Sequence, residues 1–399
     1  MENQIRSWVK QAIENEGFSS YDVKLSDGIK NGDGFVGQVI FARVTGVTES
    51  GEPKQLHLAL KLSKDNAAFR ESMGESAFHQ EIIMYEDVFP AFQTFQHQKQ
   101  IRAPFSAHPR CLKCLKLENK EILVLEDLRS GGYALHDKKI CMNLAHSRMV
   151  LREYARLHAL SFALRDQNRL LFDSLTRNMK DPFVDFLSAP ATRKAMNIGI
   201  QQALDLLKKS GDEDLYKKYE QLTKGGADRL VEAVATIDEK AVIVHGDCWN
   251  NNFMFQYKNN DKTSPSSVMI LDWQFSSLKS PTYDLAYFLY LTSSRSANLF
   301  HQFLQEYHEH LSDFLIQLGS SPSLYTFEDL QKHWRTAQTF GMLFMPTAFK
   351  FVVGEEENLP DFARMEEGTA LGDLLSLIPR PENKEYYERL KCAIQYAEL

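Results

Sequence analysis

The chain reads VHGDCWNNNF at residues 244–253 and ILDW at residues 270–273. Asn252 follows Asp247 after five residues, and Asp272 follows Asn252 after a further 20. Phosphoryl transfer depends mainly on positioning and on neutralising charge. Asp247 can accept the proton of an attacking hydroxyl, while Asn252 and Asp272 offer the hard oxygen ligands that suit Mg²⁺. The spacing therefore predicts a phosphotransferase that uses Mg-ATP, with Asp247 as its catalytic base.

A hairpin is expected to bring these three side chains together. Apolar runs at residues 241–244 and 268–271 predict strands, and the polar run at residues 257–267 predicts the connecting loop. Asp also occurs commonly in turns and caps at strand ends, where it has only a structural part. The rest of the chain decides between these interpretations, because a kinase also needs a phosphate clamp and an adenine site.

The first part of the chain carries the features of such a site. Strands are predicted at residues 21–29, 38–48 and 55–62. Between the first two lies GDGFVG, in which Gly32, Gly34 and Gly37 would let backbone amides approach phosphates closely. The third strand ends in LALK, so that Lys61 is placed to hold the α- and β-phosphates. Each feature also has a plain structural interpretation, as a tight turn and as a solvated strand lysine.

A helix and a further strand complete the predicted nucleotide site. Residues 75–89 carry an apolar stripe at helical spacing, and Glu81 lies beside this stripe, where it can pair with Lys61. Residues 121–128 read EILVLEDL, an apolar strand that ends in acidic residues. We expect this strand to form the hinge, with the backbone of Glu126 and Leu128 hydrogen-bonded to adenine.

Together these segments resemble the insect ecdysteroid kinase-like family, also described as CHK kinase-like, which is related to choline kinase and aminoglycoside phosphotransferase. The matching segments are HGDCWNNN at 245–252, LDWQ at 271–274, SPTYDLAYFL at 280–289, FHQEIIMY at 78–85 and LHALS at 157–161. The resemblance extends from about residue 21 to residue 351.

The resemblance implies an α+β, two-lobed protein-kinase-like fold. Its small N-lobe, residues 1–128, would hold an antiparallel sheet and one helix, and its large, mainly helical C-lobe would span residues 129–399. It implies ATP and Mg²⁺ as cofactors and a small-molecule hydroxyl as acceptor, foremost an ecdysteroid phosphorylated at the 22-hydroxyl. His245 and Asp284 would brace the catalytic segment rather than contact substrate.

Two departures from protein kinases argue against a protein acceptor. Asp272 is followed by Trp273 and Gln274, where protein kinases carry Phe-Gly, and no Ala-Pro-Glu element follows. Other acceptors stay open: a xenobiotic or plant alcohol in a detoxifying kinase, choline or an aminoglycoside, or no acceptor at all in a nucleotide-binding pseudokinase.

Composition excludes several other classes. The net charge of −7 gives no electrostatic drive toward nucleic acid. No run approaches the roughly 18 apolar residues of a membrane span, so a cytoplasmic protein is expected. The five cysteines are scattered, which argues against a disulfide framework. Cys111 and Cys114 could form half of a zinc site, but the sequence offers no second pair of ligands at a suitable spacing.

Beyond residue 128 the pattern is mainly helical, and the helices after residue 291 are the expected source of an acceptor pocket. Helices are predicted at residues 147–163, 181–187, 191–209, 214–236, 283–291, 296–318, 327–351 and 382–397. Residues 340–346, FGMLFMP, could line a pocket for a flat apolar acceptor, with Pro346 bending the helix. Ordinary core packing is the favoured interpretation of this stretch, because apolar helical stripes usually face the core.

Overall fold

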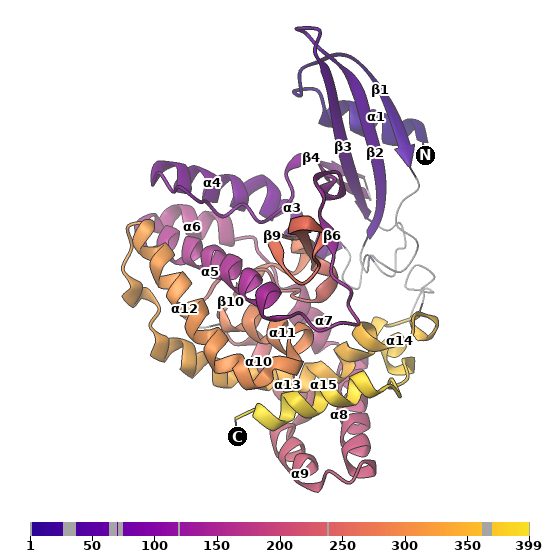
Figure 1. The fold of residues 1–399 in the computed structure, drawn as a ribbon, viewed down its shortest axis with the longest axis vertical. Coiled ribbons are helices and arrows are strands. Elements are labelled where there is room, and N and C mark those ends of the chain that lie inside the picture. The colour runs from indigo at the N-terminus through magenta and orange to yellow at the C-terminus, as the bar shows by residue number, and fades with distance from the viewer. Residues whose placement is uncertain are drawn as a thin grey trace.

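The computed structural model describes residues 2–26, 37–63, 70, 75–118, 120–237, 239–360 and 369–398. An antiparallel sheet near the N-terminus is followed by a mainly helical remainder (Figure 1). This architecture confirms the predicted α+β fold class. The proposed domain boundary after Leu128 stays a prediction.

The N-terminal sheet has five antiparallel strands in the order β1, β2, β3, β5, β4. Their bounds are β1 (Phe18–Ser26), β2 (Gly37–Thr48), β3 (Pro53–Ser63), β4 (Cys111–Leu117) and β5 (Lys120–Glu126). Successive side chains of a strand point to opposite faces. On β3, Leu58, Leu60 and Leu62 are buried in a core shared with helix α1 (Glu2–Ala12), so Lys61 points to the other face. Helix α1 and strand β4 were not among the predicted elements.

The face of the sheet that carries Lys61 is met by helix α3 (Glu75–Ile83). A π-helical turn (Met84–Val88) and helix α4 (Phe89–Gln98) continue from α3, so the predicted helix at 75–89 is longer than expected. Phe78 and Ile82 of α3 are buried in the large core of the helical part. Because α3 is anchored in that core, it holds the buried Glu81 in a fixed place opposite the sheet.

The helical part is built from eleven α-helices among the described residues. They are α5 (Leu144–Gln167), α6 (Arg169–Thr176), α7 (Pro182–Ser188), α8 (Pro190–Lys209), α9 (Glu213–Leu222), α10 (Gly226–Ala235), α11 (Thr282–Thr292), α12 (Phe300–Gln317), α13 (Phe327–Val353) and α15 (Lys384–Tyr396), with the short helix α14 (Leu371–Leu377) packed on α8. The predicted helix at 214–236 is two helices. The break lies at Gly225 and Gly226, whose φ angles of 93° and 52° no right-handed helix permits.

The segments at residues 244–253 and 270–273 lie on two small sheets inside the helical part. Strand β7 (Val242–Val244) pairs with β10 (Ser277–Lys279), and β8 (Phe253–Tyr257) pairs with β9 (Pro265–Ile270) and with β6 (Ala134–Leu135). The predicted hairpin is present only in part: the run at 268–271 supplies most of its second arm, β9, but the first arm is β8, whereas the predicted strand at 241–244 is β7 and pairs with β10. Asn252 immediately precedes β8 and Asp272 follows β9 by two residues, and the Leu271 N–H donates to the Asn252 carbonyl at 2.9 Å.

Among the described residues, no helix combines the length and the apolar composition needed to cross a bilayer.

Candidate active site

Asp247 lies at the end of a turn that only glycine permits. Gly246 has a φ of 87°, and a Cβ atom there would lie 2.1 Å from the Phe275 carbonyl oxygen. Asp247 is 7% exposed, and both of its carboxylate oxygens accept a hydrogen bond. Tyr287 Oη donates to Oδ1 and Asn252 Nδ2 donates to Oδ2, each at 2.9 Å. Burial, and then the nearby charge of Asp272, raise the pKa of Asp247 to about 7.

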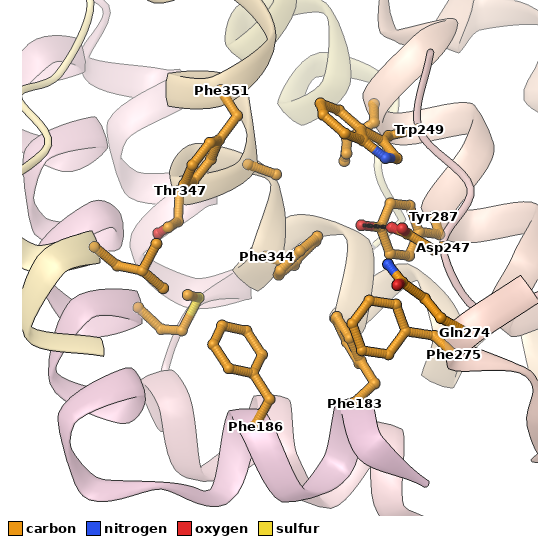
Figure 2. Close-up of a pocket in the computed structure, with 14 residues that line it drawn as sticks. Phe183, Phe186, Asp247, Trp249, Gln274, Phe275, Tyr287, Phe344, Thr347 and Phe351 are labelled. Atoms are coloured by element: carbon orange, nitrogen blue, oxygen red, sulfur yellow. Dashed lines mark hydrogen bonds between the residues drawn. The ribbon is translucent and has the colours of Figure 1, made fainter. Parts of the chain in front are cut away.

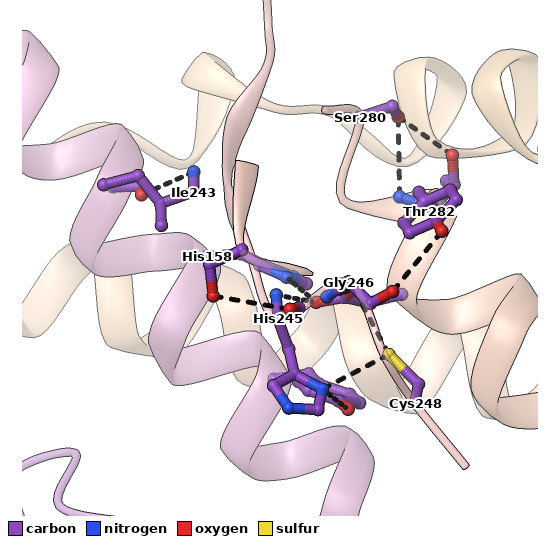
Figure 3. A network of polar contacts seen from close by, with 12 residues as sticks. His158, Ile243, His245, Gly246, Cys248, Ser280 and Thr282 are labelled. Atoms are coloured by element: carbon purple, nitrogen blue, oxygen red, sulfur yellow. Dashed lines mark hydrogen bonds and ion pairs between the residues drawn. The ribbon is translucent and has the colours of Figure 1, made fainter. Parts of the chain in front are cut away.

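A buried carboxylate, that of Asp284 at the start of α11, holds the backbone that leads to Asp247. Figure 3 shows its hydrogen-bond partners His158, His245, Gly246 and Cys248. The N–H groups of His245 and Gly246 donate to its two oxygens at 2.7 and 2.9 Å. His158 Nε2 and Cys248 Sγ each lie 3.2 Å from the same carboxylate. Burial opposes the ionisation of Asp284, but these hydrogen bonds, that of His158 foremost, keep its pKa below the usual value.

Three charged side chains from distant parts of the chain meet at the face of the sheet. Lys61 Nζ lies 2.5 Å from Glu81 Oε2, and it also pairs with Asp272 Oδ1. Burial alone would lower the pKa of Lys61, but the two carboxylates raise it above its usual value. Burial raises the pKa of Glu81 to about 6, although the charge of Lys61 opposes this shift. Asp272 has a φ of 65°, a left-handed conformation that Asp tolerates better than most residues.

The other predicted nucleotide contacts are only partly described. Gly32 and Gly34 lie outside the described residues, and Gly37 is the first residue of β2. Glu126 ends β5 and Leu128 begins a short 3₁₀ turn, as expected of a connection between the sheet and the helical part. The Glu126 residue also lines a second cavity of about 940 Å³ beside α4.

The residues at the hairpin fit a magnesium site completed by phosphate oxygens. Asn252 directs its Nδ2 to Asp247, so its side-chain oxygen is the atom that could serve as a ligand. Among the described residues, no three His, Cys, Asp or Glu side chains are grouped so that they could hold a metal by themselves. Cys111 and Cys114, whose sulfurs are 3.6 Å apart, thus have no third ligand of these types there.

A cavity of about 100 Å³ adjoins Asp247 on the side of the helices (Figure 2). Its aromatic walls are formed by Phe183, Phe186, Trp249, Phe275, Tyr287, Phe344 and Phe351. Met196, Asp247, Gln274, Leu291, Thr347, Ala348 and Leu375 complete the lining. Asp247 is thus the only carboxylate among these residues, and no lysine, arginine or histidine is among them.

The sequence pointed to one wall of this cavity and missed the others. Phe344, from the predicted stretch at 340–346, lines the cavity, whereas Phe340 is stacked behind it with 5.4 Å between ring centroids. Helix α13 continues through Pro346. Proline has no N–H, so the Met342 carbonyl lacks its usual partner within the helix, and Tyr219 Oη donates to this carbonyl instead, at 3.1 Å. One signal for Tyr287 was available, because it follows Asp284 by three residues on one helix.

Comparison with known proteins identifies one family. The model of the ecdysteroid kinase-like family matches residues 31–320. No curated protein matches the chain. Among solved structures, a mutant aminoglycoside 2′-phosphotransferase-IIIa in its GDP complex is 11% identical in sequence, with a TM-score of 0.42, over 88% of this chain and 89% of that chain. At this level of similarity, the nucleotide bound to that enzyme says nothing about the ligands of this chain.

Proposed function

Because this chain belongs to the ecdysteroid kinase-like family, we propose that it is an ATP-dependent kinase for a hydroxyl of an uncharged, mainly apolar small molecule. The proposed acceptor is an ecdysteroid, phosphorylated at its side-chain 22-hydroxyl. One observation carries the proposal: Asp247 is hydrogen-bonded to Asn252 on the hairpin that bears Asp272, and it also lines the aromatic cavity. A single carboxylate thus borders the proposed metal site and the space for an acceptor.

In the proposed reaction, Asp247 takes the proton of the acceptor hydroxyl while the hydroxyl oxygen bonds to the γ-phosphorus of ATP and ADP leaves. Asn252 and Asp272 would hold Mg²⁺, which supplies positive charge against the phosphate oxygens. Lys61, oriented by Glu81, would hold the α- and β-phosphates. The burial of these charges supports this assignment, because a buried lysine between two carboxylates is well placed to exchange one of them for phosphate.

The remaining predicted residues would bind the adenine ring and cover the phosphates of ATP. The backbone of Glu126 and Leu128 would bind adenine at the connection between the sheet and the helical part. The loop of Gly32, Gly34 and Gly37 would cover the phosphates.

The size of the cavity limits which part of an acceptor can reach Asp247. Its volume is about 100 Å³, whereas an engineered protein cavity of roughly 150 Å³ holds one benzene molecule. A hydroxyl on a flexible aliphatic tail fits this space more readily than a four-ring steroid nucleus does. The cavity therefore favours a side-chain hydroxyl of a steroid over a ring hydroxyl.

The charge of the lining supports an uncharged acceptor. Asp247 is the only carboxylate in the lining, so the several ammonium groups of an aminoglycoside would be desolvated without partners. A quaternary ammonium group is different, because aromatic faces bind such a cation directly. The aromatic walls therefore make a choline-type amino alcohol the second candidate acceptor.

The test is a screen of acceptors with ATP and Mg²⁺, read by the mass gain of one phosphate. The panel contains ecdysteroids, choline, an aminoglycoside and a phenolic glycoside. We expect product with an ecdysteroid, and turnover lowered by about two to four orders of magnitude in Asp247→Asn with ATP binding retained. Product with the phenolic glycoside alone would instead favour a detoxifying kinase for plant alcohols.

The matched control is Asp261→Asn, in the exposed loop between β8 and β9, which should keep normal turnover. A lack of any phosphorylated product would contradict the kinase assignment and favour a pseudokinase. Normal turnover in Asp247→Asn would remove Asp247 from the role of base.

A further inference from the structure

Resting on the function proposed above, we propose that Gln274 recognises a second hydroxyl of the acceptor, close to the hydroxyl that is phosphorylated. The acceptor class is thereby narrowed to uncharged apolar molecules that carry two neighbouring hydroxyls. Gln274 is not one of the residues assigned to Mg-ATP or to proton transfer, and it lies two residues beyond Asp272.

The first observation is a buried polar atom without a partner. Gln274 is 1% exposed, and among the described residues its Oε1 accepts no hydrogen bond. Leaving a buried amide oxygen unpaired costs free energy, and native structures rarely do so without a reason. Gln274 lines the acceptor cavity, and Figure 2 shows its amide end beside Asp247 and Tyr287. A bound molecule can therefore supply the missing partner.

The second observation concerns which chemical group fits there. The neighbouring walls, including Phe183 and Phe275, are aromatic and offer no hydrogen bond to a polar group of the acceptor. A hydroxyl both donates and accepts, so it pairs with an amide in either orientation. A quaternary ammonium group has no N–H to donate to Oε1, and a carboxylate only accepts hydrogen bonds and would be repelled by Asp247. A hydroxyl is thus the group that best satisfies Gln274.

Thr347, on the opposite wall, provides an internal comparison. Its Oγ1 also lacks a partner among the described residues, and it too lines the cavity. This oxygen lies against helix α8, because a Cβ atom added to Gly199 would be 2.2 Å from it. Figure 2 shows Thr347 across the cavity from Asp247 and Gln274. It is therefore badly placed to meet a hydroxyl next to the reacting one.

The experiment compares two sterols that differ by one hydroxyl, 20,22-dihydroxycholesterol and 22-hydroxycholesterol. Binding is measured by the fluorescence of Trp249 in the cavity wall, with Trp249→Phe to identify the source of the signal. Phosphorylation of each sterol is measured separately by mass. We expect the wild-type protein to bind the diol about tenfold to a hundredfold more tightly, the range that follows from leaving one buried polar group unpaired.

The variants test whether this preference comes from Gln274. Gln274→Met keeps the length of the side chain but removes the amide, and it should bind both sterols equally. Gln274→Glu keeps an accepting oxygen and should keep the preference for the diol. Thr347→Val removes the other unpaired oxygen and should also keep it. The thermal midpoint of each variant shows whether it is folded.

Equal affinity of the wild-type protein for the two sterols, or binding of neither, would overturn the inference. A preference for the diol that survives in folded Gln274→Met would overturn the inference as well. If Gln274→Met does not fold, the deciding variant is Thr347→Val, and loss of the preference for the diol in that variant would overturn the inference. Tight binding of the diol without transfer of phosphate would contradict the proposed kinase function but leave the recognition by Gln274 intact. The two failures are thus distinguishable.

Discussion

Asn in place of Asp284 should uncouple the turn that carries Asp247 from its support. The carboxylate of Asp284 accepts the His245 N–H on one oxygen and the Gly246 N–H on the other. An asparagine has only one oxygen, so in either orientation its NH₂ group faces a backbone N–H. One buried backbone N–H loses its acceptor, together with either His158 Nε2, a ring nitrogen that can change tautomer, or Cys248 Sγ, a weak donor. The remaining backbone hydrogen bond is no longer charge-assisted.

The expected loss of stability follows from these two changes. An unsatisfied buried donor costs about 1–3 kcal/mol, and the loss of charge assistance costs about 1 kcal/mol more, which gives about 2–4 kcal/mol in total. Unfolding entropy is about 2 cal/mol/K per residue, or about 0.8 kcal/mol/K for this chain of 399 residues. The thermal midpoint of Asp284→Asn should therefore fall by about 2.5–5 °C. Turnover should fall at least about tenfold, because Asp247 follows the released backbone directly.

The assay is thermal unfolding followed by circular dichroism, together with turnover at saturating ATP. The matched control is Asp228→Asn, which removes a carboxylate that is 80% exposed in its side chain and pairs with Arg193 at 2.8 Å. An exposed pair contributes little, so the control should shift by less than about 1 °C. If Asp284→Asn behaves like this control in both measurements, the hydrogen bonds to Asp284 do not hold the turn and the reasoning is refuted.

Three further substitutions test neighbouring features. Gly246→Ala should lower both the thermal midpoint and turnover, because its φ of 87° and the contact at 2.1 Å leave no room for a Cβ atom; a stable, active variant would contradict the geometry. Tyr287→Phe should lower turnover about tenfold at nearly unchanged stability, because it removes a hydrogen bond to Asp247; unchanged turnover measured at saturating ATP would limit Tyr287 to packing. Burial alone would raise the pKa of Asp329, but the hydrogen bonds from Lys240 and Thr326 lower it to about 2. Ionised Asp329 therefore stabilises the fold above about pH 4, and this contribution is lost as the pH falls through 2. The urea midpoints of wild type and Asp329→Asn should therefore converge between pH 4 and pH 2, and a constant difference would contradict this.

The parts of the site that local periodicity governs could be predicted from the sequence. Alternation along residues 55–62 places Lys61 on the face opposite Leu60, because a strand has a period of two. The helical stripe of α3 similarly fixes where Glu81 can point. The ion pair between Lys61 and Glu81 required only that the helix meet the correct face of the sheet. Helix α1 carries the same kind of signal, with Ile5, Trp8 and Val9 at helical spacing, although its amphipathic pattern extends over only 11 residues.

The acceptor cavity could not be predicted in this way, because its walls come from segments far apart in the chain. Phe186 lies on α7, Met196 on α8, Phe344 on α13 and Leu375 on α14. An apolar residue on a helix has the same local pattern whether it fills the core or borders a cavity. Only the packing of these helices against one another leaves the space open. The polar Gln274 is a similar case, since its missing partner becomes evident only when every surrounding atom is placed.

Helix α11 links the two halves of the site, and this link has a consequence for specificity. Asp284, Tyr287 and Leu291 lie at helical spacing on it: the first holds the turn that carries Asp247, the second contacts Asp247, and the third lines the cavity. A helix moves as a unit, so a change in the cavity wall that shifts α11 also shifts the hydrogen bonds around Asp247. In such an arrangement, the shape of the acceptor and the position of the base cannot vary independently. Enlarging the cavity by Leu291→Ala should therefore lower kcat as well as raise KM. Met196→Ala, which enlarges the cavity at a wall on the separate helix α8, should mainly raise KM.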